Sequence, residues 1–212
     1  EHISLVSYCC GSYYKGNYGG VAQFDYHLKS VFIDRIFFQG PSQKSELLEY
    51  LNKNPNSIII TDNHLSCDIP NKYKVFIVHH GCAITTAKRN PNWKEPWKSL
   101  CTNGQNKMLD FRETNNTEII SCSQSCINDF TEYFGEKYTK FKIHKLLHTS
   151  SCNLKLKKTK FNTKNPVILG NWDYGKKGKH IVDKLSNISS KFTYLDLNVK
   201  PANGNIKKFI QD

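Results

Sequence analysis

The sequence predicts an α/β fold: a doubly wound, parallel-sheet Rossmann-like domain followed by an incomplete second α/β unit. Apolar, β-branched runs such as residues 57–61 and 75–78 have the composition of strands buried on both faces. Segments with helical spacing alternate with these runs, which favours a parallel sheet. Several runs end in polar residues or glycine, and open α/β sheets bind their ligands at the carboxyl ends of such strands.

The first predicted elements are a strand at residues 3–7, a loop rich in glycine and tyrosine at 9–20, and a helix at 21–28. Strand, glycine loop and helix form an arrangement that can cradle phosphates. Glycine lets the backbone approach an anion, and a helix N-terminus presents free N–H groups. The loop has neither the G-x-G-x-x-G pattern nor a P-loop, so a plain surface loop is an equal alternative.

The next predicted elements are a strand at 35–38, a helix at 45–52 and a strand at 57–61. A turn at 69–71 then leads into the stretch 75–82. Its apolar residues predict a buried strand, and two histidines, a glycine and a cysteine follow at its end.

Residues 83–102 are irregular, contain Trp93 and Trp97, and predict a long loop or short helix near the strand ends. These tryptophans could stack on a sugar, or they could simply belong to a packed covering loop. A helix is predicted at 105–112 and a strand at 118–123. The following helix should be capped by a serine or threonine near Ser123 and run to about Phe134.

A strand at 141–146 completes the predicted N-terminal domain, residues 1–152. Residues 153–165 are rich in lysine and threonine and predict a linker. The last 47 residues, 166–212, predict the start of a second domain, because they are too few for a complete sheet domain. Within it we expect strands at 166–171 and 192–197 and a helix at 177–185.

The chain carries a formal charge of +12, but only three of its 30 basic residues are arginine. Arginine usually carries base and phosphate recognition, so this composition argues against a nucleic-acid partner. It favours smaller anionic ligands, including diphosphates, and peripheral contact with an anionic membrane. We see no membrane span and no signal-peptide pattern, and we expect a cytoplasmic protein.

The eight cysteines show no C-x-x-C and no zinc-site spacing, so we expect reduced, mostly buried thiols and no metal. A hydrolase that uses Cys82 or Cys10 with His79 is a less favoured interpretation, because no cysteine–histidine pair has a recognised motif.

The main candidate site residues are His79 and His80, which follow the strand predicted from residue 75. Asn63 and His64 end the neighbouring strand and are candidates for contact with a substrate, and Asp62 could orient a histidine. The alternative is that these side chains are structural caps at the strand ends.

Four short segments, in the order in which they occur along the chain, resemble parts of glycosyltransferases of the two-Rossmann-domain (GT-B) type, particularly the retaining family 4. The glycine loop at Gly19-Gly20 with its helix resembles the first loop of that family, and 78–81 resembles the strand that ends in His-Gly. Residues 120–125 resemble the serine-containing step from strand to helix. Gly170-Asn171 with Lys177-Gly178 resembles the opening of the donor domain.

The resemblance implies transfer of a sugar from a nucleotide-sugar donor to a hydroxyl acceptor, such as a glycan, without a metal or other cofactor. Gly19 and Gly20 would approach the donor diphosphate, and Lys177 would pair with it as a point charge. His79 or His80 would face the transferred sugar as the catalytic histidine, while Asn63 and His64 would contact the acceptor.

Two features depart from the family pattern. Asn171 stands where the family usually has arginine, and the chain ends before the segment with the paired glutamates that bind the donor. We therefore expect a fragment of a longer enzyme or a degenerate protein, with little activity by itself. The competing interpretation is a non-catalytic α/β module that binds sugars or, through its basic surface, anionic polymers.

Overall fold

The computed structural model describes residues 3–9, 24, 28, 34–91, 93–146, 167–170, 184 and 193–196. The chain divides into two compact units, residues 1–150 and residues 151–212. Within the described residues, no helix combines the length and the apolar character needed to cross a membrane.

The first unit contains a six-stranded sheet in which every neighbouring pair is parallel. Its strands, in chain order, are β1 (Leu5–Cys9), β2 (Ile36–Gln39), β3 (Ile58–Asp62), β4 (Lys74–His79), β5 (Thr117–Ser121) and β6 (Lys142–Lys145). Each corresponds to a predicted strand, with ends that differ from the prediction by one or two residues. In β3 and β4, consecutive β-branched and aromatic residues favour the extended conformation.

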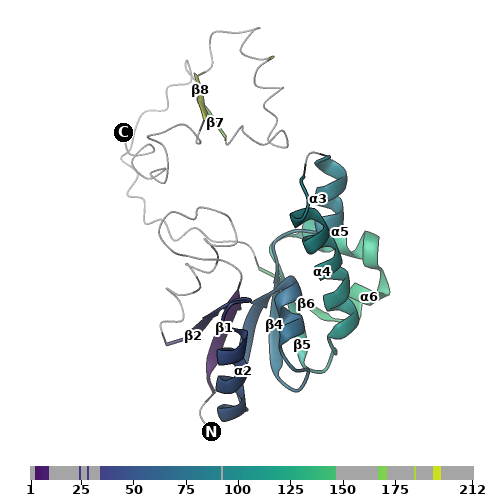
Figure 1. The fold of residues 1–212 in the computed structure, drawn as a ribbon. Helices are drawn as coiled ribbons and strands as arrows, with labels where there is room; N and C mark the ends of the chain where they lie inside the picture. Colours follow the sequence, from purple (N-terminus) through teal and green to yellow (C-terminus); the bar gives the residue numbers. More distant parts are fainter. Residues whose placement is uncertain are drawn as a thin grey trace. The chain divides into compact units, whose positions relative to one another are not determined.

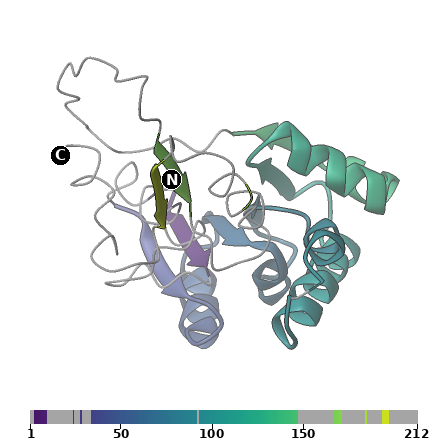
Figure 2. The ribbon, with the colours of Figure 1, turned by 90° about the horizontal axis from the view of Figure 1, so that it is seen from above.

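The spatial order of the strands is β2-β1-β3-β4-β5-β6, so the direction of winding reverses beside β1. Such a reversal defines a doubly wound sheet, and parallel neighbours require crossover connections. The predicted fold class is thereby confirmed. Figures 1 and 2 show the described helices of this unit running along one side of the sheet.

Five α-helices and a 3₁₀ helix connect the described strands. They are α2 (Lys44–Lys53), η1 (Asn63–Asp68), α3 (Ala83–Arg89), α4 (Trp97–Phe111), α5 (Gln124–Phe134) and α6 (Glu136–Thr139). The predicted cap of α5 is present, because the Ser123 hydroxyl accepts a hydrogen bond from the Cys126 amide. Gly135, with φ of 52°, ends α5 in a conformation that glycine adopts without strain.

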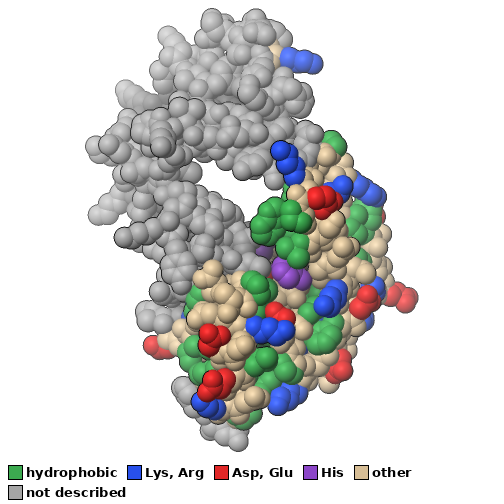
Figure 3. All heavy atoms as spheres, in the orientation of Figure 1, with side chains coloured by type: hydrophobic (Ala, Val, Ile, Leu, Met, Phe, Trp, Pro, Cys, Tyr) green, Lys and Arg blue, Asp and Glu red, His purple; other side chains and the backbone are tan. Residues whose placement is uncertain are grey.

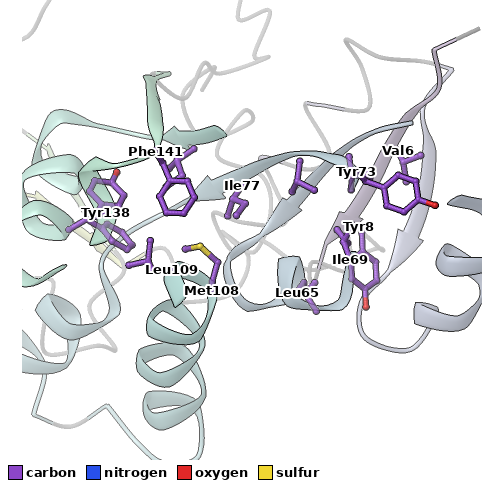
Figure 4. Packing of buried hydrophobic residues seen from close by; sticks show 14 of the residues in the cluster. Val6, Tyr8, Leu65, Ile69, Tyr73, Ile77, Met108, Leu109, Tyr138 and Phe141 are labelled. Atoms are coloured by element: carbon purple, nitrogen blue, oxygen red, sulfur yellow. The ribbon is translucent and has the colours of Figure 1, made fainter. Parts of the chain in front are cut away.

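The hydrophobic core lies between the sheet and these helices (Figure 4). Alternate strand residues point into it because successive side chains of a strand face opposite sides of the sheet. Side chains of α2, α4, α5 and α6 meet them from the other side. The buried residues include Val6, Tyr8, Leu47, Leu51, Ile59, Val75, Ile77, Met108, Leu109, Ile119, Phe130 and Tyr138.

Helix α4 begins at Trp97, eight residues before the helix that the sequence predicts. Its first turns contain Trp97 and Leu100 among polar residues, but both side chains are exposed, so apolar burial does not hold this part of the helix. Two long-range contacts hold the helix instead. Gly104 packs so closely on His64 that an added Cβ would lie 2.7 Å from the His64 Cβ, and Gln105 is buried against the end of β4.

Arg112, directly after α4, joins three segments of the first unit. Its guanidinium donates hydrogen bonds to the Thr117 hydroxyl at 3.0 Å and to the carbonyl oxygens of Ser66 and Ile69 at 3.4 and 2.8 Å. Arg112 is almost completely buried, and this burial lowers its pKa to about 10. The arginine therefore fixes η1, the segment that follows β3, to the amino end of β5.

The described part of the second unit contains two parallel strands, β7 (Val167–Gly170) and β8 (Thr193–Asp196). Both lie within predicted strands, and Lys184 is helical, inside the helix predicted at 177–185. The predicted linker, residues 153–165, lies outside the described residues.

Candidate functional site

A hollow of about 190 Å³ lies where β4 and β5 end, between α3 and α5. His79 at the end of β4 pairs in register with Ser121 at the end of β5, which brings the two strand ends together. Thiols, hydroxyls and charged groups line the hollow: His80, Gly81, Cys82, Thr85, Thr86, Arg89, Cys122, Ser123, Ser125, Cys126 and Asp129. Histidine side chains are visible at the surface of this unit in Figure 3.

The two histidines have different environments, although they are adjacent in sequence. His79 continues the alternation of Val75 and Ile77, so its side chain enters the core on the helix side of the sheet. It is fully buried, stacks on Phe130 with ring centroids 4.2 Å apart, and lies 5.9 Å from the ring of Tyr138. This position removes His79 from contact with a ligand in the hollow.

Burial lowers the pKa of His79 to about 3, and the neighbouring His80 contributes to the same shift. Among the described residues, neither ring nitrogen of His79 has a hydrogen-bond partner. No thiol therefore activates, or is activated by, this imidazole within that part of the chain. The buried Cys126 thiol has a pKa raised to about 12 and stays protonated.

The position of His79 predicts a specific dependence of stability on pH. Its pKa in the folded state lies below that of the unfolded state, so the unfolded chain binds the proton more readily as the pH falls through about 6.5. We expect this one group to remove about 2 kcal/mol from the free energy of unfolding between about pH 7.5 and pH 5. In His79→Leu, the free energy of unfolding, measured in urea, should therefore fall by about 2 kcal/mol less over the same pH range. An unchanged pH dependence in the variant would contradict the assignment.

His80 lines the hollow, and two side chains lie beside its ring. Its Nε2 lies 3.5 Å from Oδ1 of Asp62, the last residue of β3. The ring of Phe24 approaches edge-on, with centroids 5.4 Å apart. Phe24 belongs to the helix predicted after the glycine loop, and its ring therefore lies beside His80 at the end of β4. The structure thus places Asp62 beside His80, and its role in orienting the histidine stays a prediction.

Gln105 holds the loop between β4 and α3, a role that no pattern in the sequence predicts. Its Oε1 accepts a hydrogen bond from the Ala83 amide at 2.7 Å, and its Nε2 donates to the Gly81 carbonyl at 2.8 Å. The Cys122 thiol donates to the His80 carbonyl at 3.6 Å. Because the partners of Gln105 are more than twenty residues away in sequence, no local pattern could have identified it.

Asn63 and His64 begin η1 and do not line the hollow. The Asn63 side chain lies 3.4 Å from Gln105 Nε2, whose hydrogen bond it accepts, and His64 packs on Gly104. Both residues lie next to α4, and their contact with an acceptor stays a prediction. Gly19, Gly20 and Lys177 lie outside the described residues.

Two serines of the segment 120–125, which is predicted to connect a strand to a helix, also line the hollow. Ser123 and Ser125 lie at the start of α5, and Asp129 follows one turn later. Across the hollow, an Arg89 nitrogen lies 3.5 Å from the Asp129 carboxylate. The hollow therefore offers hydroxyl groups, a carboxylate and a guanidinium at close range.

Within the residues that the structure describes, no group of three or more histidine, cysteine, aspartate or glutamate side chains is arranged to hold a metal ion. No family model, curated protein or solved structure matches the chain.

Proposed function

We propose that the chain takes part in sugar transfer from a nucleotide sugar to a hydroxyl acceptor, and that the hollow beside His80 receives a sugar ring. The observation that carries this proposal is the lining of the hollow. Neighbouring hydroxyls, the Asp129 carboxylate and the Arg89 guanidinium can each pair with the closely spaced hydroxyl groups of a sugar. A volume of about 190 Å³ suits one such ring rather than a large cofactor.

The position of the hollow supports the same proposal. Ligands of open α/β sheets bind at the carboxyl ends of the strands, and here β4 and β5 end at the hollow. The donor would be held by Gly19 and Gly20 and by Lys177, as the resemblance of the sequence to GT-B glycosyltransferases implies. His80, oriented by Asp62, would face the transferred sugar.

The test is binding and transfer with a panel of UDP-, GDP-, ADP- and dTDP-sugars, alone and with simple sugar acceptors. We expect one nucleotide sugar to bind, and Asp129→Asn to weaken sugar binding about tenfold, the scale of a hydrogen bond to a charged group. Asp110→Asn is the matched control, because Asp110 is an exposed aspartate on α4 that pairs with Lys137. We expect it to bind like the wild type.

The outcomes distinguish sugar transfer from the competing interpretation, a non-catalytic binding module. Absence of nucleotide-sugar binding across the whole panel would overturn it. Binding of free sugars without any nucleotide sugar, still sensitive to Asp129→Asn, would instead identify a non-catalytic sugar-binding module. A steep dependence of nucleic-acid affinity on salt concentration would favour the module for anionic polymers.

A further inference from the structure

The start of α4 exposes two large apolar side chains one turn apart. Trp97 is 65% exposed and Leu100 is 44% exposed. We call Trp97 and Leu100, together with the flanking Lys94 and Lys98, the α4 patch. In Figure 3, hydrophobic side chains gather at the surface of the first unit, and lysine and arginine side chains lie on the same face.

The rest of α4 explains why these side chains point outward. The residues of α4 that are buried against the first unit come later in the helix: Gly104, Gln105, Met108 and Leu109. The first turn of α4 is not buried against the first unit. Pro96 immediately precedes this turn. Leaving a tryptophan in water forgoes the burial of a large apolar surface, so two such residues side by side indicate a surface with a partner.

The charges around the patch are mainly positive. Residues 88–98 contain Lys88, Arg89, Lys94 and Lys98 and one acid, Glu95. The side chain of Ser99 and then its amide, which donates a hydrogen bond to the Glu95 carboxylate at 3.0 Å, lower the pKa of Glu95 and tie its charge to the helix start. Beside Trp97, Lys94 is exposed and Lys98 is half-buried.

We propose that the α4 patch docks the protein on the surface of an anionic lipid bilayer. Tryptophan favours the interface of a membrane, where its ring is apolar and its N–H can still meet water. Leucine one turn away would enter the acyl boundary, and the lysines would meet anionic headgroups. A second copy of this chain would bring like charges together at the same patch, so the charge favours the bilayer. This proposal is independent of the proposed function.

The test is sedimentation of the full chain with two kinds of vesicles. One kind contains phosphatidylcholine with about one third phosphatidylglycerol, and the other contains phosphatidylcholine alone. We expect binding to the anionic vesicles that weakens as the salt concentration rises. Trp97→Ser with Leu100→Ser should weaken it at least about tenfold, and Lys94→Gln with Lys98→Gln should weaken it roughly thirtyfold.

Phe111→Ser is the matched control, because Phe111 is a 39% exposed apolar residue at the other end of the same helix. It should bind vesicles like the wild type. Three results would overturn the proposal: no binding to anionic vesicles, equal binding to both kinds, or binding that the Trp97 and Leu100 changes leave intact. Concentration-dependent dimers that the same changes abolish, without vesicle binding, would identify a second copy as the occupant instead.

Discussion

Replacing Arg112 by methionine should lower the free energy of unfolding by about 3 kcal/mol or more. Methionine fills much of the same space but cannot donate to the Thr117 hydroxyl or to the carbonyls of Ser66 and Ile69. Ser66, Ile69 and Thr117 are fully buried, so water cannot replace the arginine. Urea unfolding measures the change, and the melting temperature should fall by about 10 °C.

Two further variants keep this prediction testable even if Arg112→Met does not fold. Arg112→Lys keeps the charge, but a single ammonium cannot reproduce the fork of the guanidinium, so we expect an intermediate loss. Arg89→Met is the matched control, because the Arg89 side chain is 70% exposed, and its stability should change by less than about 0.5 kcal/mol. Equal stability of the Arg112 and Arg89 variants would contradict the role of Arg112.

The sheet could be predicted from the sequence because its strands carry their own signal. The strands β3 and β4 are runs of β-branched and aromatic residues with polar residues at their ends, and the structure contains both. The start of α4 and the helix η1 carry no such signal. Contacts between distant segments, such as His64 with Gly104, hold them, and a local pattern cannot show these contacts.

The sequence could not show which of the two histidines is buried in the core and which lines the hollow. Strand alternation places His79 on the side of Val75 and Ile77, and His80 on the opposite side. Both sides of β4 are rich in apolar residues, however, so the pattern does not show which side the helices cover. Only the stacking of His79 on Phe130 and the position of His80 in the lining of the hollow distinguish them.

His80→Ala should reduce sugar transfer at least ~10²-fold, the scale expected when a positioned polar group is lost from an active site. This prediction rests on the proposed function. His80 lines the hollow beside Asp62, whereas the core is packed around His79. Removal of the His80 imidazole should therefore leave no large core cavity and change the melting temperature little. Transfer is measured per folded protein with the nucleotide sugar that the panel identifies.

His79→Ala should show the reverse pattern. It empties space beside Phe130 and Tyr138, and a cavity in a packed core costs about 3 kcal/mol. The folded fraction of this variant should retain most of its transfer activity, because His79 does not line the hollow. Asp62→Asn should reduce sugar transfer about tenfold if the carboxylate only orients His80, which is a smaller loss than in His80→Ala and a larger one than in His79→Ala. Normal transfer by folded His80→Ala would end the catalytic interpretation of the histidine pair, since His79 is closed off in the core.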